Sequence, residues 1–131
     1  MNNQHSNDTN PSERRRYTRI DSNLSINIRN GNFDIVTETK NISCIGAYCQ
    51  VDRYVPLLTK LKTSILIPTK TKDNSKHIDC GGIVVRIEKL NHPLEELYNI
   101  AIYFNEIKKD DLNKIESFVK EQAQYKSLTS A

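Results

Sequence analysis

The sequence predicts a mainly β protein, a six-stranded antiparallel barrel followed by one C-terminal α-helix. Three observations support this fold class. Apolar and polar residues alternate with a period of two through most of residues 22–105. Short turn-forming segments divide this stretch into six parts. After about residue 109 the apolar residues recur at helical spacing instead.

Six strands are expected from the alternation. Of two glycine-containing segments, one predicts a hairpin turn between strands and the other an irregularity within a strand. Asn30-Gly31 is a strong signal for a type I′ hairpin turn. Gly81-Gly82 interrupts the alternation and indicates a bulge or bend, after which Ile83, Val85 and Ile87 continue the apolar set. The expected strands lie at about residues 24–28, 33–40, 47–51, 61–67, 78–87 and 100–104.

A single helix is expected from about residue 109 to 124. Apolar residues recur every three or four positions between Leu112 and Val119, which gives the helix one apolar face. Asp110 and Asp111 lie at its start, where negative charge interacts favourably with the helix dipole. The apolar face would cover part of the barrel.

The chain of 131 residues fits one domain. With no Trp and three Phe, its core must consist mainly of Ile, Val and Leu. We expect a disordered polar tail at 1–12, a domain at 13–124 and a frayed tail at 125–131. No apolar run approaches the roughly 18–20 residues that span a bilayer, and the N-terminus lacks an apolar signal segment. We therefore expect a cytoplasmic protein without membrane insertion.

Positive charge is concentrated in one short segment. Four of the seven arginines are Arg14, Arg15, Arg16 and Arg19, and removing their four charges from the formal net charge of +3 leaves −1. The chain is therefore a near-neutral domain with one cationic segment. This distribution favours a compact anionic partner over a long polyanion.

The cysteines do not indicate a disulfide framework or a metal site. Cys44, Cys49 and Cys80 are odd in number, widely spaced and without a Cys-x-x-Cys pair. Cys44 and Cys49 could be combined with His77 as metal ligands, but the spacing does not favour that reading. We expect small, partly buried thiols in strands and no metal.

Two short motifs carry a family resemblance. Arg15–Arg19 reads Arg-x-x-x-Arg and is preceded by Arg14, and Asn41–Gly46 reads Asn-x-Ser-x-x-Gly. In this order, on six strands and a helix, they resemble the signature of the PilZ family over residues 13 to about 120. The resemblance implies a PilZ-type β-barrel that binds the second messenger cyclic di-GMP and needs no cofactor.

The resemblance also implies which residues bind. An arginine arm at 13–19 would close over the ligand, and Asn41 would offer a donor and an acceptor to a guanine edge. Arginine suits this ligand because it binds phosphate through two contacts, pairs with guanine O6 and N7, and stacks on bases. Gly46 would permit a positive φ, or a close approach of the backbone to the ligand. The implied ligand-binding residues are Arg14, Arg15, Arg19, Asn41, Ser43 and Gly46.

Arg14 bears on stoichiometry. In PilZ domains an arginine just before Arg-x-x-x-Arg goes with a stacked pair of ligands, so the resemblance implies two cyclic di-GMP molecules here. We expect residues 1–19 to be mobile without ligand and residues 14–19 to become ordered with it.

Three other functions remain open. A basic arm on a small barrel could bind nucleic acid, although no aromatic-rich strand face is present and specific nucleic-acid binding is not expected. A PilZ-like scaffold without ligand is a second alternative. An enzyme is least favoured, because no catalytic triad order, Gly-rich phosphate loop or metal-ligand spacing occurs. As an adaptor, the domain would act through an effector protein that the sequence does not identify.

Overall fold

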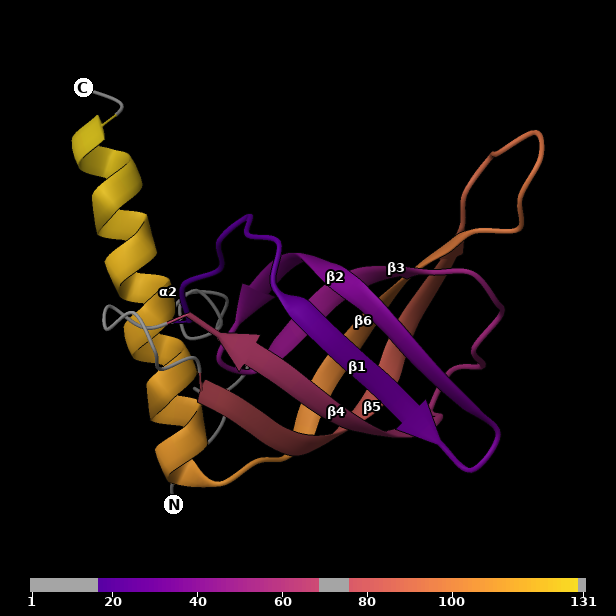
Figure 1. The fold of residues 1–131 in the computed structure, drawn as a ribbon, viewed down its shortest axis with the longest axis horizontal. Helices are drawn as coiled ribbons and strands as arrows, with labels where there is room; N and C mark the ends of the chain where they lie inside the picture. The colour runs from indigo at the N-terminus through magenta and orange to yellow at the C-terminus, as the bar shows by residue number, and fades with distance from the viewer. Residues whose placement is uncertain (1–16, 69–75, 130–131) are drawn as a thin grey trace, which may run out of the picture.

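Six antiparallel strands form a closed barrel in the order β1-β2-β3-β6-β5-β4, and one helix, α2, lies across the end of the barrel where β4 ends (Figure 1). This computed structural model describes residues 17–68 and 76–129, with side chains as far as residue 125. The predicted six-stranded barrel with a C-terminal helix is confirmed. Its elements are β1 (Ser25–Asn30), β2 (Phe33–Ser43), β3 (Gly46–Val51), β4 (Lys60–Ile67), β5 (Lys76–Lys89), β6 (Tyr98–Glu106) and α2 (Lys109–Thr129).

The barrel closes because β1 pairs with both β2 and β4. Alternate side chains of each strand therefore point into one enclosed core. Ile26 of β1 lies opposite Ile65 of β4, and both are completely buried. The expectation of a core rich in Ile, Val and Leu is confirmed. Because side chains fill the interior, a ligand must bind on the outside of the barrel.

The hairpin between β1 and β2 differs from the prediction. Its two turn residues are Gly31 and Asn32, and no described glycine has a positive φ, so the predicted type I′ turn is wrong. The Asn30 side chain closes the turn instead, since its Oδ1 accepts hydrogen bonds from the backbone N–H of Asn32 (2.7 Å) and Phe33 (3.3 Å). This local side-chain contact makes the left-handed conformation unnecessary.

Strand β2 runs to Ser43, three residues beyond its predicted end at Lys40. The pairing of β2 with β3 shifts register between Thr39 and Asn41, which is a β-bulge. Thr39 is buried there. Its hydroxyl Oγ1 accepts a hydrogen bond from the N–H of Leu24 at 2.9 Å and donates one to the carbonyl of Ser22 at 2.6 Å. Strand pairing therefore continues past the bulge into the second motif.

Strand β5 also departs from the expected alternation. Register shifts occur between Gly81 and Ile83 and again between Val84 and Arg86. The first confirms the bulge predicted at Gly81-Gly82. The second was not predicted, and it places Val84 in the core while Val85 is 50% exposed. The predicted alternating apolar set of Ile83, Val85 and Ile87 is therefore wrong, since Ile87 packs against the core but Ile83 and Val85 do not.

Helix α2 has the expected apolar face and acidic start, with Ile115, Phe118 and Val119 buried and Asp110 and Asp111 in its first turn. It continues to Thr129, so the predicted end at residue 124 is wrong. The sequence has no Gly or Pro after Pro93 that would end the helix. Residues 1–12, expected to form a disordered tail, lie outside the described residues.

The three cysteines are free thiols, with Cys44 and Cys49 completely buried. Within residues 17–68 and 76–129, no group of three or more His, Cys, Asp or Glu side chains is placed to hold a metal. Across the same ranges, no helix combines the length and the apolar character needed to cross a membrane.

The buried thiols predict a loss of stability at alkaline pH. Burial raises the pKa of Cys49 to about 12, and burial with the nearby Glu116 raises the pKa of Cys44 to about 11, against 9.0 for an exposed thiol. Above pH 9 the unfolded chain releases these protons and the folded chain keeps them, so the free energy of unfolding falls as pH rises toward 11. Urea denaturation at pH 8 and pH 10.5 measures this. The Cys44→Ala/Cys49→Ala variant should lose less stability across that interval than the wild type, and an equal loss would contradict the assignment.

Candidate ligand-binding site

A short backbone bridge holds the end of the arginine arm on the barrel. The N–H of Ile20 donates to the carbonyl of Ile42 at 3.0 Å, and the N–H of Ile42 donates back at 3.0 Å. Both isoleucine side chains are buried. Because neighbouring side chains on an extended strand alternate in direction, Arg19 lies over the polar side chains on either side of Ile42.

Arg19 joins the two sequence motifs. Its Nη1 donates to Oδ1 of Asn41 at 2.5 Å, and its Nη2 donates to Oγ of Ser43 at 3.2 Å. Desolvation at the barrel wall lowers the pKa of Arg19 from its usual value. No acidic side chain among the described residues forms an ion pair with this guanidinium. The cation is therefore held by neutral acceptors and is free to attract an anion.

The second motif forms the turn between β2 and β3. Oγ of Ser43 accepts a hydrogen bond from the N–H of Ile45 at 3.2 Å, which stabilises the Cys44–Ile45 turn. Gly46 does not have a positive φ, so the first of its two expected roles is wrong. The second role, a close approach of the backbone to the ligand, stays a prediction. Within the protein, a Cβ added at Gly46 would lie 2.3 Å from the carbonyl oxygen of Ile102, so the packing of β3 against β6 itself requires glycine here.

These residues lie at an open pocket of about 480 Å³ on the outer face of the barrel. The side chains around it come from the arm and from β2, β3, β5 and β6, and none is acidic. A larger groove of about 960 Å³ lies between α2 and the barrel and includes no motif residue. The lining of the smaller pocket consists of Arg19, Asn41, Ile45, Gly46, Ala47, Tyr48, Val85, Arg86, Ala101, Ile102 and Tyr103.

The structure places Arg19, Asn41 and Gly46 in the lining of this pocket, and Ser43 lies next to it through its hydrogen bond with Arg19. Arg14 and Arg15 lie outside the described residues. The range 1–19, predicted to be mobile without ligand, includes Arg19, and the structure shows Arg19 hydrogen-bonded to the barrel in the absence of ligand.

Three polar residues of the pocket lining were not predicted as site residues from the sequence. Tyr48, Arg86 and Tyr103 come from three different strands and meet only through the strand order of the barrel. The Tyr48 hydroxyl donates to Oε1 of Glu88 at 2.8 Å, and burial together with this contact raises the pKa of Tyr48. No local signal in the sequence marks these residues, since each sits in an ordinary alternating strand.

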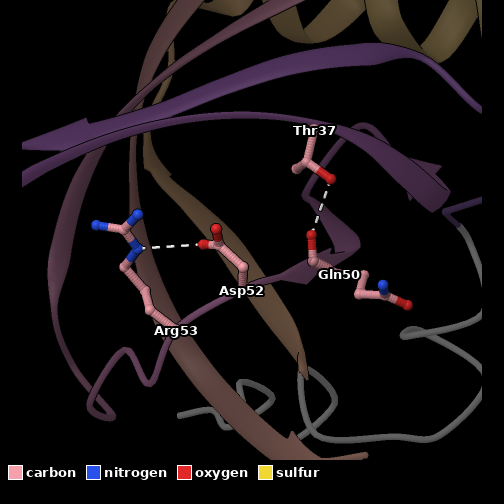
Figure 2. Close-up of polar contacts among 4 residues, drawn as sticks. All are labelled: Thr37, Gln50, Asp52 and Arg53. Atoms are coloured by element: carbon pink, nitrogen blue, oxygen red, sulfur yellow. Dashed lines mark hydrogen bonds and ion pairs between the residues drawn. The ribbon is translucent and has the colours of Figure 1, made fainter. Parts of the chain in front are cut away.

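Arg53 lies elsewhere and already has partners. It follows the end of β3 opposite to Gly46, where its Nε contacts Oδ1 of Asp52 at 3.2 Å (Figure 2). Its guanidinium also lies over the ring of Phe33, 5.7 Å from the centroid. On the neighbouring strands, Thr37 Oγ1 donates to the carbonyl of Gln50 at 2.8 Å, as Figure 2 shows. Arg53 is thus an exposed arginine outside the pocket.

The chain belongs to the PilZ family, because the PilZ domain model matches residues 13–121. The match includes both motifs, all six strands and most of α2. It confirms the resemblance indicated by the motifs. No curated protein sequence gives a significant match.

Solved structures share the fold. The Bacillus subtilis inhibitor of motility MotI/DgrA matches with a TM-score of 0.73 and 23% identity, over 86% of this chain and 52% of its own. The PilZ domain of Escherichia coli YcgR, solved with c-di-GMP, matches with a TM-score of 0.57 and 14% identity, over 87% of this chain and 97% of its own. Borreliella burgdorferi PlzA, also in complex with c-di-GMP, matches with a TM-score of 0.56 and 9% identity, over 82% of this chain and 52% of its own. The chain thus spans about half the length of MotI and PlzA.

The close approach at Gly46 predicts that Gly46→Ala destabilises the fold. The new methyl group would overlap the Ile102 carbonyl, and backbone cannot move aside as a flexible side chain can. We expect the free energy of unfolding to fall by about 1–3 kcal/mol, the usual cost of overpacking. Urea denaturation measures this. Gly31→Ala is the matched control, since nothing lies within 4 Å of its Cβ position, and it should change stability by less than about 0.5 kcal/mol. Equal effects of the two variants would contradict the steric explanation.

Proposed function

We propose that the protein is a receptor for cyclic di-GMP that binds the ligand in the pocket beside Arg19, Asn41 and Gly46. The observation that carries the proposal is the guanidinium of Arg19, held over the second motif by two neutral acceptors at a pocket without acidic side chains. Membership of the PilZ family and the c-di-GMP complexes of YcgR and PlzA support this ligand.

The chemistry of the pocket suits a cyclic dinucleotide. Its phosphates are anionic, and an arginine binds phosphate through a charge-assisted fork of two N–H donors. When the ligand binds, Arg19 exchanges one or both of its neutral acceptors for phosphate or guanine oxygens, and Asn41 is released to pair with a guanine edge. Tyr48 and Tyr103 offer aromatic surface at the same pocket for base stacking.

In this proposal the arm closes over the ligand by movement of residues 13–18. Ile20 remains bridged to Ile42 and acts as the fixed end of the arm. Arg14 and Arg15 then approach the ligand from the side opposite the barrel wall. The closed arm and the ligand together present a new surface to an effector protein, and the domain itself performs no catalysis.

Arg15→Ala and Arg19→Ala should each weaken cyclic di-GMP binding at least tenfold. Each removes a charge-assisted contact of about 1.5–3 kcal/mol while leaving the core intact. Isothermal titration calorimetry gives the affinity, and thermal melting should show little change. Arg53→Ala is the matched control and should bind like the wild type, because Arg53 lies outside the pocket. Wild-type affinity in either arm variant would refute the role assigned to the arm.

The wild type should bind two cyclic di-GMP molecules per protomer, and Arg14→Leu should bind one. Two stacked ligands bring four phosphates together, so their repulsion requires several cations from the arm. Base stacking of roughly 1–3 kcal/mol per base then favours the pair. The calorimetric endpoint at saturation measures the ratio. An endpoint of one for the wild type would overturn the stacked pair without affecting the identity of the ligand.

A further inference from the structure

The second bulge of β5 turns Arg86 toward the pocket. In a regular strand, residues 84 and 86 would point to the same side. Val84 is buried in the core opposite Ile102, whereas Arg86 is exposed opposite Ala101. The register shift between them accounts for this change of side, and bulges commonly re-aim a side chain in this way next to binding sites.

Strand pairing then places Arg86 in one row with the second motif. Asn41 lies opposite Tyr48, Tyr48 opposite Ala101, and Ala101 opposite Arg86, so the row crosses β2, β3, β6 and β5 on the outside of the barrel. Neighbouring strands are about 4.8 Å apart, which puts the backbones of Tyr48 and Arg86 roughly 10 Å apart. The methyl group of Ala101 fills little of the space between them, and this space is part of the pocket.

Arg86 has no partner of its own among the described residues. The nearest acidic side chain along the outer face of its strand is that of Glu88, and this carboxylate accepts the hydrogen bond from Tyr48 at 2.8 Å. The side chain of Arg86 forms no hydrogen bond or ion pair with any residue in the described ranges. A strand-held guanidinium that forms no ion pair with a described residue thus faces a pocket whose lining has no acidic side chain.

We propose that Arg86 binds a phosphate of the ligand, on the wall of the pocket opposite Asn41. This inference rests on the proposed function and adds a residue that neither sequence motif contains. A cyclic dinucleotide has two phosphates on opposite sides of its ring, so one cationic wall satisfies only half of its charge. For the ligand that lies on the barrel, Arg19 takes one phosphate, and Arg86, roughly 14 Å of sheet away from Asn41, takes the other. Because Arg86 is part of a strand, its contribution does not depend on closure of the arm.

Arg86→Met tests the proposal by calorimetric titration with cyclic di-GMP. The variant keeps much of the aliphatic stem, and we expect its affinity to be at least tenfold weaker than that of the wild type. Arg86→Lys keeps the charge and should recover part of the loss, since an ammonium group still attracts phosphate. The matched control is Arg29→Met, because Arg29 is also an exposed strand arginine but lies on β1, outside the pocket. It should bind within twofold of the wild type.

Each outcome decides one point. If Arg86→Met binds like the wild type, or if Arg29→Met is weakened as much, the proposal is overturned and the receptor function stands. If Arg86→Lys is as weak as Arg86→Met, the contact is not a charge contact with phosphate and the assignment fails. If the wild type itself does not bind cyclic di-GMP, the proposed function fails together with this inference. Thermal melting of the Arg86 variants should match the wild type, since Arg86 has no described partner to lose.

Discussion

The pair of hydrogen bonds between Ile20 and Ile42 is the constraint on which the site depends. Arg19 is one residue from this bridge, and Asn41 and Ser43 are each one residue from it on the other strand. The bridge, together with the hydrogen bonds of Arg19 to Asn41 and Ser43, therefore sets the direction of the guanidinium. Ordering a free arginine side chain costs up to about 2 kcal/mol of entropy, and here the fold has already met part of that cost before a ligand arrives. Burial of both isoleucines stabilises the bridge, so the hydrophobic core determines where the cation lies.

Small residues on the outer face give the pocket its depth. The barrel interior is filled with isoleucine and other aliphatic side chains, so the only place for a ligand near the motifs is the outside surface of the described strands. Gly46 lets β3 approach the Ile102 carbonyl, and Ala101 leaves a depression between Tyr48 and Arg86. Larger residues at either position would raise the floor of the pocket. The contact of Tyr48 with Glu88 then fixes one aromatic wall of the pocket.

The number of strands, their positions along the chain and the apolar face of the helix could be predicted, because each follows from the local spacing of apolar residues. The sequence-based predictions of turns and strand faces are wrong where the same local sequence is compatible with two backbone conformations. Asn30-Gly31 favours a type I′ turn, but the Asn30 side chain closes a different one. Alternation in β5 favours Val85 as a core residue, but a bulge after Val84 reverses the sides. A bulge adds one residue without altering composition, so periodicity cannot locate it unless glycine marks the place, as it does at Gly81-Gly82. The helix end was misplaced for a related reason, since nothing in the sequence terminates it.

The candidate site likewise has one part that the sequence predicts and one part that it does not. Its motif half could be predicted, because Arg19, Asn41, Ser43 and Gly46 belong to two short segments with recognisable spacing. Its other half requires three facts that no single segment contains: β6 lies between β3 and β5, Ala101 faces outward, and the bulge turns Arg86 to the same side. Arg86 and Arg29 look alike in sequence, each being an arginine in an alternating strand. What distinguishes them is their neighbours in the sheet. Arg86 lies opposite Ala101, with Tyr48 one strand further on beside the second motif, whereas Arg29 lies between Asp34 of β2 and Lys62 of β4. The function of a strand residue in this fold is therefore set by register, which the chain acquires only when the barrel closes.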